Sequence, residues 1–154
     1  MRDKSEKIIA NNKKARHDYF IENVYEAGIS LSGTEVKSIR QGKVSIKESY
    51  CMIKNGEIFI INMNISPYDH GNIYNLEPSR NRKLLLTKKE INKLIGQTKE
   101  KGYSLIPLNV HLKNGWVKID IALAQGKKNY DKRESILKRE HERKIQHVLK
   151  NKYK

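Results

Sequence analysis

The stretch YSLIPLNVHLKNGWVKIDIALA, residues Tyr103–Ala124, indicates the fold class most directly. Its Asn114-Gly115 pair stands between two long apolar runs, which is the strongest short-range signal of a β-hairpin. In the second run apolar residues alternate with other residues, so one face of this strand is expected to line a core. That face holds Val117, Ile119, Ile121 and Leu123, and the opposite face holds Trp116, Lys118, Asp120 and Ala122.

Further strands are expected on both sides of this hairpin. A second Asn-Gly pair, Asn55-Gly56, also separates two apolar runs and predicts a second hairpin. A longer run nearer the N-terminus contains Gly28, which is typical of a bulge or a sharp bend. The expected strands are Tyr50–Lys54, Glu57–Asn62, residues 18–31 and residues 83–86.

Two short helices are predicted between the strands. Ser32 with Glu35, and Thr87 with Glu90, have the spacing of a capping box at a helix N-terminus. A glycine that ends the helix is expected at Gly42 in the first case and at Gly102 in the second. The side chains predicted to face the core are Val36, Ile39, Ile91, Leu94 and Ile95.

The chain of 154 residues, 18.0 kDa, has room for one domain and a tail. It carries 32 Lys and Arg against 17 Asp and Glu, a net charge of +15. Such a charge argues against a neutral or cationic partner. It favours nucleic acid, an anionic membrane or an acidic protein.

Several classes of protein are excluded by what the chain lacks. No apolar run approaches the roughly 18 residues that a membrane span needs, and the N-terminal stretch has no apolar segment of a secretory signal. The one cysteine, Cys51, cannot form an internal disulfide or a Cys-rich zinc site, and its apolar surroundings predict a buried thiol. We therefore expect a cytoplasmic, monomeric protein without a membrane partner.

The charge is concentrated near the C-terminus. Residues 126–154 hold eleven Lys or Arg and four Asp or Glu, a net charge of +7. In a helix starting at Asp131, the few apolar residues would form one narrow stripe, which is too little to hold a helix alone in water. We predict a loose arm over 1–14, an OB-like antiparallel β-barrel with flanking helices over 15–125, and a basic tail over 126–154 that is disordered when free and helical when bound.

Basic clusters with aromatic residues nearby predict RNA binding, because Lys and Arg neutralise phosphates while aromatic faces stack on unpaired bases. The alternative is a solvated basic surface with half-buried tyrosines. The clusters are Lys13-Lys14-Ala15-Arg16, Arg80-Asn81-Arg82-Lys83 and Lys127-Lys128, and the aromatic residues are His17, Tyr19, Tyr68, Tyr74 and Tyr130.

Catalytic and metal-binding motifs are not evident. The five histidines lack the spacing of a zinc site, and there is no phosphate-binding glycine motif, so no metal and no cofactor are expected. The adjacent pairs His17-Asp18 and Asp69-His70 leave one enzymatic alternative, an RNA-processing enzyme using acid–base chemistry. We expect a protein that is not an enzyme.

Four blocks of the sequence resemble the SmpB family, the SsrA-binding proteins of bacterial trans-translation. The blocks are NKKARHDYFI (Asn12–Ile21), AGISLSGTEVKSIR (Ala27–Arg40), PSRNRKLLL (Pro78–Leu86) and GKKNYDKR (Gly126–Arg133). The resemblance implies an OB-like barrel that binds the tRNA-like domain of transfer-messenger RNA (SsrA RNA) and delivers it to stalled ribosomes. It also implies a tail that enters the small-subunit decoding centre and probes the empty mRNA channel. A generic OB-type ribosomal or translation-associated protein remains the alternative.

The resemblance also implies which residues meet the RNA. Glu26 is the unusual member, because a carboxylate is a poor phosphate ligand; it is expected to accept from a base amino group or to orient a basic neighbour. The implied RNA-binding residues are Asn12, Lys13, Arg16, His17, Glu26, Lys37, Leu85, Lys127 and Lys128. The implied ribosome-binding residues of the tail are Tyr130, Asp131, Lys132, Arg133, Lys138 and Arg139.

Overall fold

Nine strands and three short helices make up the described part of the chain. The computed structural model describes residues 6–68, 75–100 and 102–127. The elements are β1 (Glu6–Asn11), α1 (Ala15–Asp18), β2 (Tyr19–Ile29), α2 (Gly33–Arg40), β3 (Val44–Ser45), β4 (Tyr50–Lys54), β5 (Glu57–Ile61), β6 (Asn64–Ile65), β7 (Arg82–Leu85), α3 (Lys88–Thr98), β8 (Tyr103–Lys113) and β9 (Trp116–Gly126). No helix among these residues is long and apolar enough to cross a membrane.

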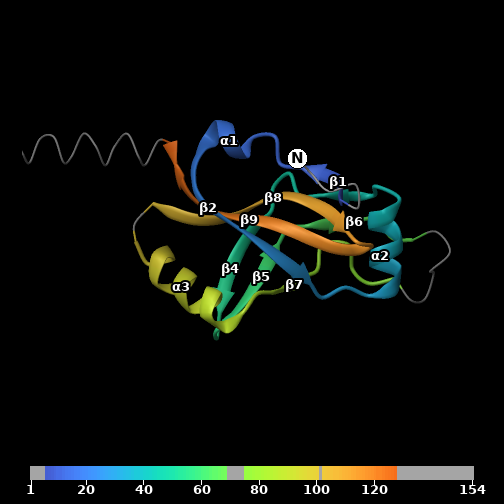
Figure 1. Cartoon of the computed structure of the whole chain (residues 1–154). Helices are drawn as coiled ribbons and strands as arrows, with labels where there is room; N and C mark the ends of the chain where they lie inside the picture. The colour runs from blue at the N-terminus through green and yellow to red at the C-terminus, as the bar shows by residue number, and fades with distance from the viewer. Residues whose placement is uncertain (1–5, 69–74, 101, 128–154) are drawn as a thin grey trace, which may run out of the picture.

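Seven of the strands form one antiparallel sheet that closes on itself. Its order is β1-β8-β4-β5-β7-β2-β9, and β9 also pairs with β8, so that six strands make a ring with β1 on its outside edge (Figure 1). The short strands β3 and β6 pair separately. The predicted class, mainly antiparallel β with short helices, is confirmed.

Both predicted hairpins are present, and their turns explain why. Asn55 and Gly56 have φ of 54° and 75°, and Asn114 and Gly115 have φ of 52° and 82°. A two-residue turn with positive φ at both positions matches the twist of the strands it joins, and Asn and Gly adopt that conformation most easily. Strand pairing begins directly beside each turn, at Lys54–Glu57 and at Lys113–Trp116.

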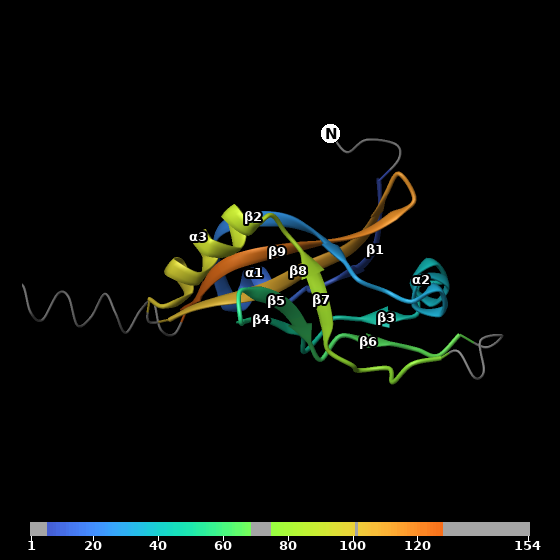
Figure 2. The same cartoon turned by 90° about the horizontal axis from the view of Figure 1, so that it is seen from below.

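Helices α2 and α3 cover the two ends of the ring, one at each end (Figure 2). Both capping boxes form as predicted, because Ser32 and Thr87 each accept from the backbone of the glutamate three residues later. Gly42, with φ of 77°, follows the end of α2, whereas α3 already ends at Thr98, before Gly102. The fully buried helix residues of the main core include Ile39 and Leu94.

A second, smaller cluster lies outside the ring. Ala15 of α1 packs there against side chains of the β8–β9 hairpin, and Figure 1 shows α1 and α3 on opposite sides of that hairpin. Ala122, which the alternation placed on the face opposite the core, is therefore buried under α1. The cluster consists of Ala15, Ile106, Leu108, Ala122 and Ala124.

Residues 6–11 differ from the loose arm expected over 1–14. They form β1, which pairs with β8 from Glu6–Lys113 to Asn11–Asn109. Ile9 and Ala10 pack against the main core, so the strand gains burial as well as hydrogen bonds. An apolar stretch this short gives no strand signal by itself.

A bulge or sharp bend was predicted at Gly28, but the bulges lie elsewhere. The pairing register shifts between Ile21 and Asn23 in β2 and between Pro107 and Asn109 in β8, while Gly28 stays in register with Leu85. A Cβ atom at Gly28 would lie 3.3 Å from the Cβ of Leu85, so this glycine permits a close approach of β2 and β7.

Candidate nucleic-acid interface

Three of the predicted RNA-binding residues line one cavity of about 360 Å³. Lys13 and Arg16 are exposed, and Asn12 is half-buried. The opposite wall is made by strands β8 and β9. Besides these three residues, the cavity is lined by Asn11, Val24, Leu108, Asn109 and Asp120.

Asn12 fixes the position of this basic segment. Its side chain donates from Nδ2 to the carbonyl of Pro107 at 3.0 Å, and its backbone N–H donates to the carbonyl of Leu108 at 2.8 Å. Both acceptors belong to the bulged part of β8. Because Ala15 is then buried against the same strand, Lys13 and Arg16 are held outward, toward solvent.

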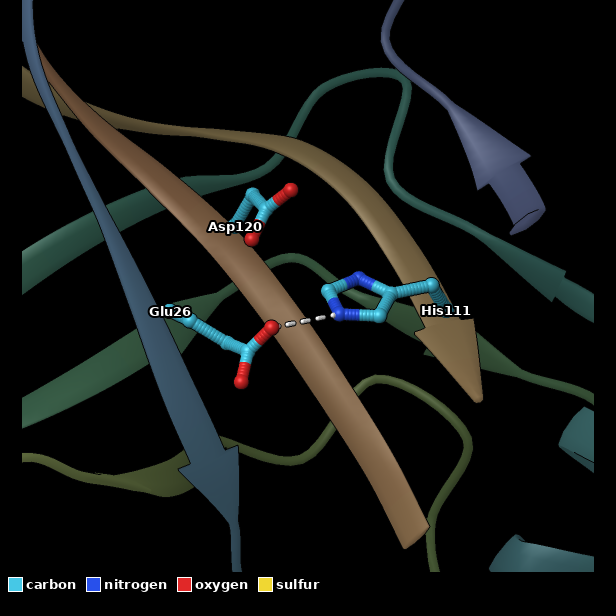
Figure 3. Close-up of side chains that lie close together, drawn as sticks. All are labelled: Glu26, His111 and Asp120. Carbon is cyan, nitrogen blue, oxygen red and sulfur yellow. Dashed lines mark hydrogen bonds and ion pairs between the residues drawn. The ribbon is translucent and has the colours of Figure 1, made fainter. Parts of the chain in front are cut away.

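A chain of polar side chains runs across the sheet beside this cavity. Asn109 Nδ2 donates to Asp120 Oδ2 at 3.0 Å, and Asn109 Oδ1 lies 2.7 Å from His111 Nδ1. His111 Nε2 lies 3.1 Å from Glu26 Oε2, and Lys113 Nζ donates to Glu26 Oε1 at 3.3 Å. Figure 3 shows Glu26, His111 and Asp120 pointing toward one another from three different strands.

The bulge in β8 brings these groups together. Before the bulge, Ile106 and Leu108 face the outer cluster; after it, Val110 faces the main core. The extra residue therefore turns Asn109 and His111 to the outer face, where they join Glu26 and Asp120, which are directly opposite each other in β2 and β9.

Within this network of polar side chains, the carboxylate of Glu26 and its hydrogen-bond donors affect each other's pKa values. Burial alone would raise the pKa of Glu26, but hydrogen bonds from His111 and Lys113 outweigh it and lower the pKa below its ordinary value. The hydrogen bond and charge of Glu26 in turn raise the pKa of Lys113.

Among the described residues, Glu26, His111 and Asp120 are the candidates for a metal site. Ligand atoms of Glu26, His111 and Asp120 all lie within 4.8 Å of one another. However, both ring nitrogens of His111 already contact side-chain oxygens, and the Lys113 ammonium places a positive charge against Glu26. The arrangement therefore favours a hydrogen-bond network over a cation site.

A second cavity, of about 670 Å³, holds two more of the predicted residues. His17 and Lys127 line it together with Asp18, Tyr19, Gly102, Ser104 and Gly126. Lys127 Nζ lies 5.3 Å from the centre of the Phe20 ring, a cation–π contact in which the ring remains 45% exposed. The N-terminal basic block and the start of the tail are thus neighbours in space.

The remaining predicted residues are dispersed. Leu85 is 51% exposed and lies beside Gly28, two residues from Glu26 along β2. Lys37 is exposed on α2, with Nζ 5.4 Å from the centre of the Tyr68 ring. Outside the described residues lie Lys128, Tyr130, Asp131, Lys132, Arg133, Lys138 and Arg139, and also the Asp69-His70 pair.

The prediction that Arg80-Asn81-Arg82-Lys83 is an RNA-binding cluster is wrong in part, because Arg82 is completely buried. Arg82 and the partly buried Arg80 both bind Glu35 of α2, with Arg82 Nε 2.6 Å from Glu35 Oε2. Burial raises the pKa of Glu35, but the hydrogen bonds from Arg80, from the backbone of Ser32 and from Arg82 outweigh it and lower the pKa. These arginines join α2 to β7, and Arg82 has no contact with solvent.

Three polar residues of the interface were not among the predicted RNA-binding residues: Asn109, His111 and Asp120. Their clustering depends on the bulge in β8, which is a long-range feature. Two local signals were present in the sequence. Pro107 within a strand is typical of a bulge or an edge, and Asp120 lies on the face of the predicted last strand that is opposite the core.

A closed antiparallel sheet with exposed basic side chains around two neighbouring cavities defines a nucleic-acid-binding protein of the β class. The family model described as SmpB protein matches residues 9–151 of the chain. The chain belongs to the SmpB family.

Known relatives match nearly the whole chain. The SsrA-binding protein of Halothermothrix orenii is 59% identical over 144 residues, covering 94% of this chain and 93% of that protein. The SsrA-binding protein of Acetivibrio thermocellus is 58% identical over 154 residues, the full length of both. A chain from the solved structure described as "tmRNA-SmpB: a journey to the center of the bacterial ribosome" has a TM-score of 0.63 and 46% identity, covering 76% of this chain and 82% of that one.

Proposed function

We propose that this protein binds the tRNA-like domain of transfer-messenger RNA and delivers it to stalled ribosomes, acting without catalysis. The observation that carries the proposal is the match to SsrA-binding proteins at 58–59% identity over 94–100% of the chain. The similar solved structure, described in terms of tmRNA, SmpB and the bacterial ribosome, supports the same role.

The geometry suits such a role. Lys13 and Arg16, held outward beside β8, would neutralise phosphates of the RNA backbone. Glu26, held by His111 and Lys113, presents a fixed carboxylate that can accept from a base amino group. Together these contacts combine backbone affinity with recognition of a particular RNA shape.

The alternative of an RNA-processing enzyme finds less support. His17 Nδ1 and Asp18 Oδ1 lie 2.9 Å apart, but their side chains are 87% and 51% exposed. Acid–base catalysis works best in a site that excludes water, whereas both of these side chains are more than half exposed. A contact to RNA fits its position better.

The proposed role beyond binding belongs to the tail, residues 126–154. Its net charge of +7 suits a channel lined by ribosomal RNA phosphates, and we propose that it becomes helical in the mRNA channel when message is missing.

The direct experiment is recovery of RNA with the full-length protein from cells of its own source, followed by sequencing of the bound RNA. We expect transfer-messenger RNA to be enriched far above its share of total RNA. Recovery of tRNA and ribosomal RNA in proportion to their abundance would instead indicate a general translation-associated binder.

Substituting Glu26→Ala is expected to weaken binding of the tRNA-like domain by about 1.5–3 kcal/mol, or about 10- to 150-fold, because a charged hydrogen bond is lost. The free energy of unfolding should fall by no more than about 1–3 kcal/mol, because Glu26 is 35% exposed but its partner His111, with a side chain 2% exposed, loses one hydrogen bond. Binding titrations and thermal unfolding measure the two effects.

Glu22→Ala is the matched control, because Glu22 is an exposed carboxylate of the same strand and its removal changes the net charge equally. It should leave the affinity unchanged or slightly higher. A Glu26→Ala protein that unfolds much more easily but binds RNA normally would show that Glu26 is structural.

A further inference from the structure

Trp116 is the most exposed large hydrophobic side chain in the described part of the chain, at 73%. It is the first residue of β9, directly after the Asn114-Gly115 turn. Such a turn does not require a tryptophan, because the residue after the other Asn-Gly turn is Glu57, an exposed carboxylate. A ring this exposed also gains little from burial, so the stability of the free protein does not explain the side chain.

Trp116 projects from the same face of the sheet as the polar side chains around Glu26. It lies directly opposite Lys113 in the β8–β9 pair, and residues directly opposite each other share a face. Lys113 Nζ in turn donates to Glu26 Oε1 at 3.3 Å. The period of two along β9 agrees, because it places Trp116 on the face of Asp120. The indole is therefore continuous with the surface proposed to meet RNA.

The backbone that carries Trp116 is held on both sides. Before it, Arg40 of α2 donates from Nη2 to the carbonyl of Gly115 at 3.2 Å. After it, the side chain of Val117 is buried in the main core. An aromatic ring on a fixed backbone loses little conformational entropy when a partner covers it.

The charges beside the indole favour an anionic partner. The charge of Lys113 is offset by two carboxylates, Glu26 at 3.3 Å and Glu6 at 3.7 Å. The positive charge near the ring therefore comes chiefly from Lys118, two residues along the same face of β9, and from Arg40 at the turn. An exposed aromatic ring beside such cations is typical of a surface where an unpaired base stacks and neighbouring phosphates meet the basic groups.

We infer that Trp116 is an RNA-contact residue that stacks on an unpaired base of the tRNA-like domain, beside the contact made by Glu26. The inference rests on the proposed function and adds a residue that none of the four sequence blocks contains. Stacking tolerates any base but requires that the base be unpaired, so this contact favours a loop of the RNA over its helices.

The chain contains one tryptophan, so tryptophan fluorescence reports on this position in the unaltered full-length protein. Titration with the tRNA-like domain should quench the fluorescence and protect the indole from quenching by acrylamide. Both changes should saturate at the RNA concentration at which a filter-binding assay saturates.

Trp116→Ala should weaken binding of the tRNA-like domain by about 5- to 150-fold, the loss expected for one base–aromatic stack. Trp116→Tyr should keep most of the affinity, because tyrosine also offers a ring face, whereas Trp116→Leu should lose it. Tyr50→Ala is the matched control, because it removes a 46% exposed aromatic side chain from β4, and it should bind as the wild type does. Thermal unfolding of Trp116→Ala should be nearly unchanged, because the side chain is mostly exposed.

Normal RNA affinity of Trp116→Ala, or fluorescence that stays constant while RNA saturates the protein, would overturn the inference. So would a Trp116→Leu protein that binds as tightly as Trp116→Tyr, because the contact would then not be stacking. These three results leave the proposed function intact, since the wild-type protein still binds the tRNA-like domain. Absence of binding by the wild type would overturn the proposed function and, with it, the role of Trp116.

Discussion

Replacing Arg82 with alanine is expected to lower the free energy of unfolding by about 3–5 kcal/mol, the largest stability effect we expect from a single charged side chain here. Arg82 is 0% exposed, and Glu35, its partner, is 5% exposed. Its guanidinium also donates to three carbonyls, those of Met63 at 2.7 Å, Pro78 at 2.9 Å and Arg80 at 3.1 Å. Removal takes this donor from the buried carbonyl of Met63 and leaves the Glu35 carboxylate with Arg80 as its remaining arginine partner, while the Pro78 carbonyl still accepts from the backbone of Ile65.

The neighbouring residue provides the control. Lys83 pairs with Glu57 at 3.2 Å, but the two side chains are 46% and 49% exposed, so Lys83→Ala should cost less than about 1 kcal/mol. Urea unfolding of both variants measures the difference. Arg82 is not a structural residue if Arg82→Ala lowers the free energy of unfolding no more than Lys83→Ala does. The sequence-based prediction, in which Arg82 belongs to an RNA-binding cluster, would then be favoured.

Deletion of residues 131–154 is expected to abolish tagging on stalled ribosomes while leaving the fold and most of the RNA affinity intact. All nine strands, both cavities and the Glu26 network precede the deletion. The deleted segment is proposed to act in the mRNA channel, where the 20 residues from 131 to 150 would form a helix of about 30 Å. A reconstituted tagging assay and an RNA titration measure the two functions separately.

A tail of the same composition in scrambled order serves as the control, because it keeps length and charge but loses the narrow apolar stripe through Leu137 and Ile145. We expect it to fail in tagging as well. Full tagging by the truncated protein would contradict the proposed role. So would amide exchange data that reveal a stable helix packed on the body of the free protein.

Local signals in the sequence predicted much of this fold. The Asn-Gly turns and the two capping boxes depend on residues only a few positions apart, and both kinds of motif formed as expected. Cys51 is likewise buried, and burial raises the pKa of its thiol to about 12. The turns and the capping boxes depend on neighbouring residues, whereas the burial of Cys51 also depends on Leu105, which pairs with it across the sheet.

The features that sequence reasoning missed depend on distant contacts. Arg82 becomes a core residue because Glu35 lies opposite it, 47 positions away in the chain. His111 reaches Glu26, 85 positions away, because a bulge turns β8 by one residue. A run of basic residues looks the same in sequence whether it faces RNA or a buried carboxylate. The pairing of strands determines which of the two it does.

The body of the protein is proposed to recognise the tRNA-like domain of transfer-messenger RNA. The most direct measurement is competition: the labelled tRNA-like domain bound to the full-length protein is challenged with unlabelled elongator tRNA at constant salt. We predict that elongator tRNA displaces it only at concentrations at least about tenfold higher than the unlabelled tRNA-like domain, a difference of about 1.4 kcal/mol or more. Displacement by both RNAs at equal concentrations would contradict the claim, because charge alone would then account for the binding.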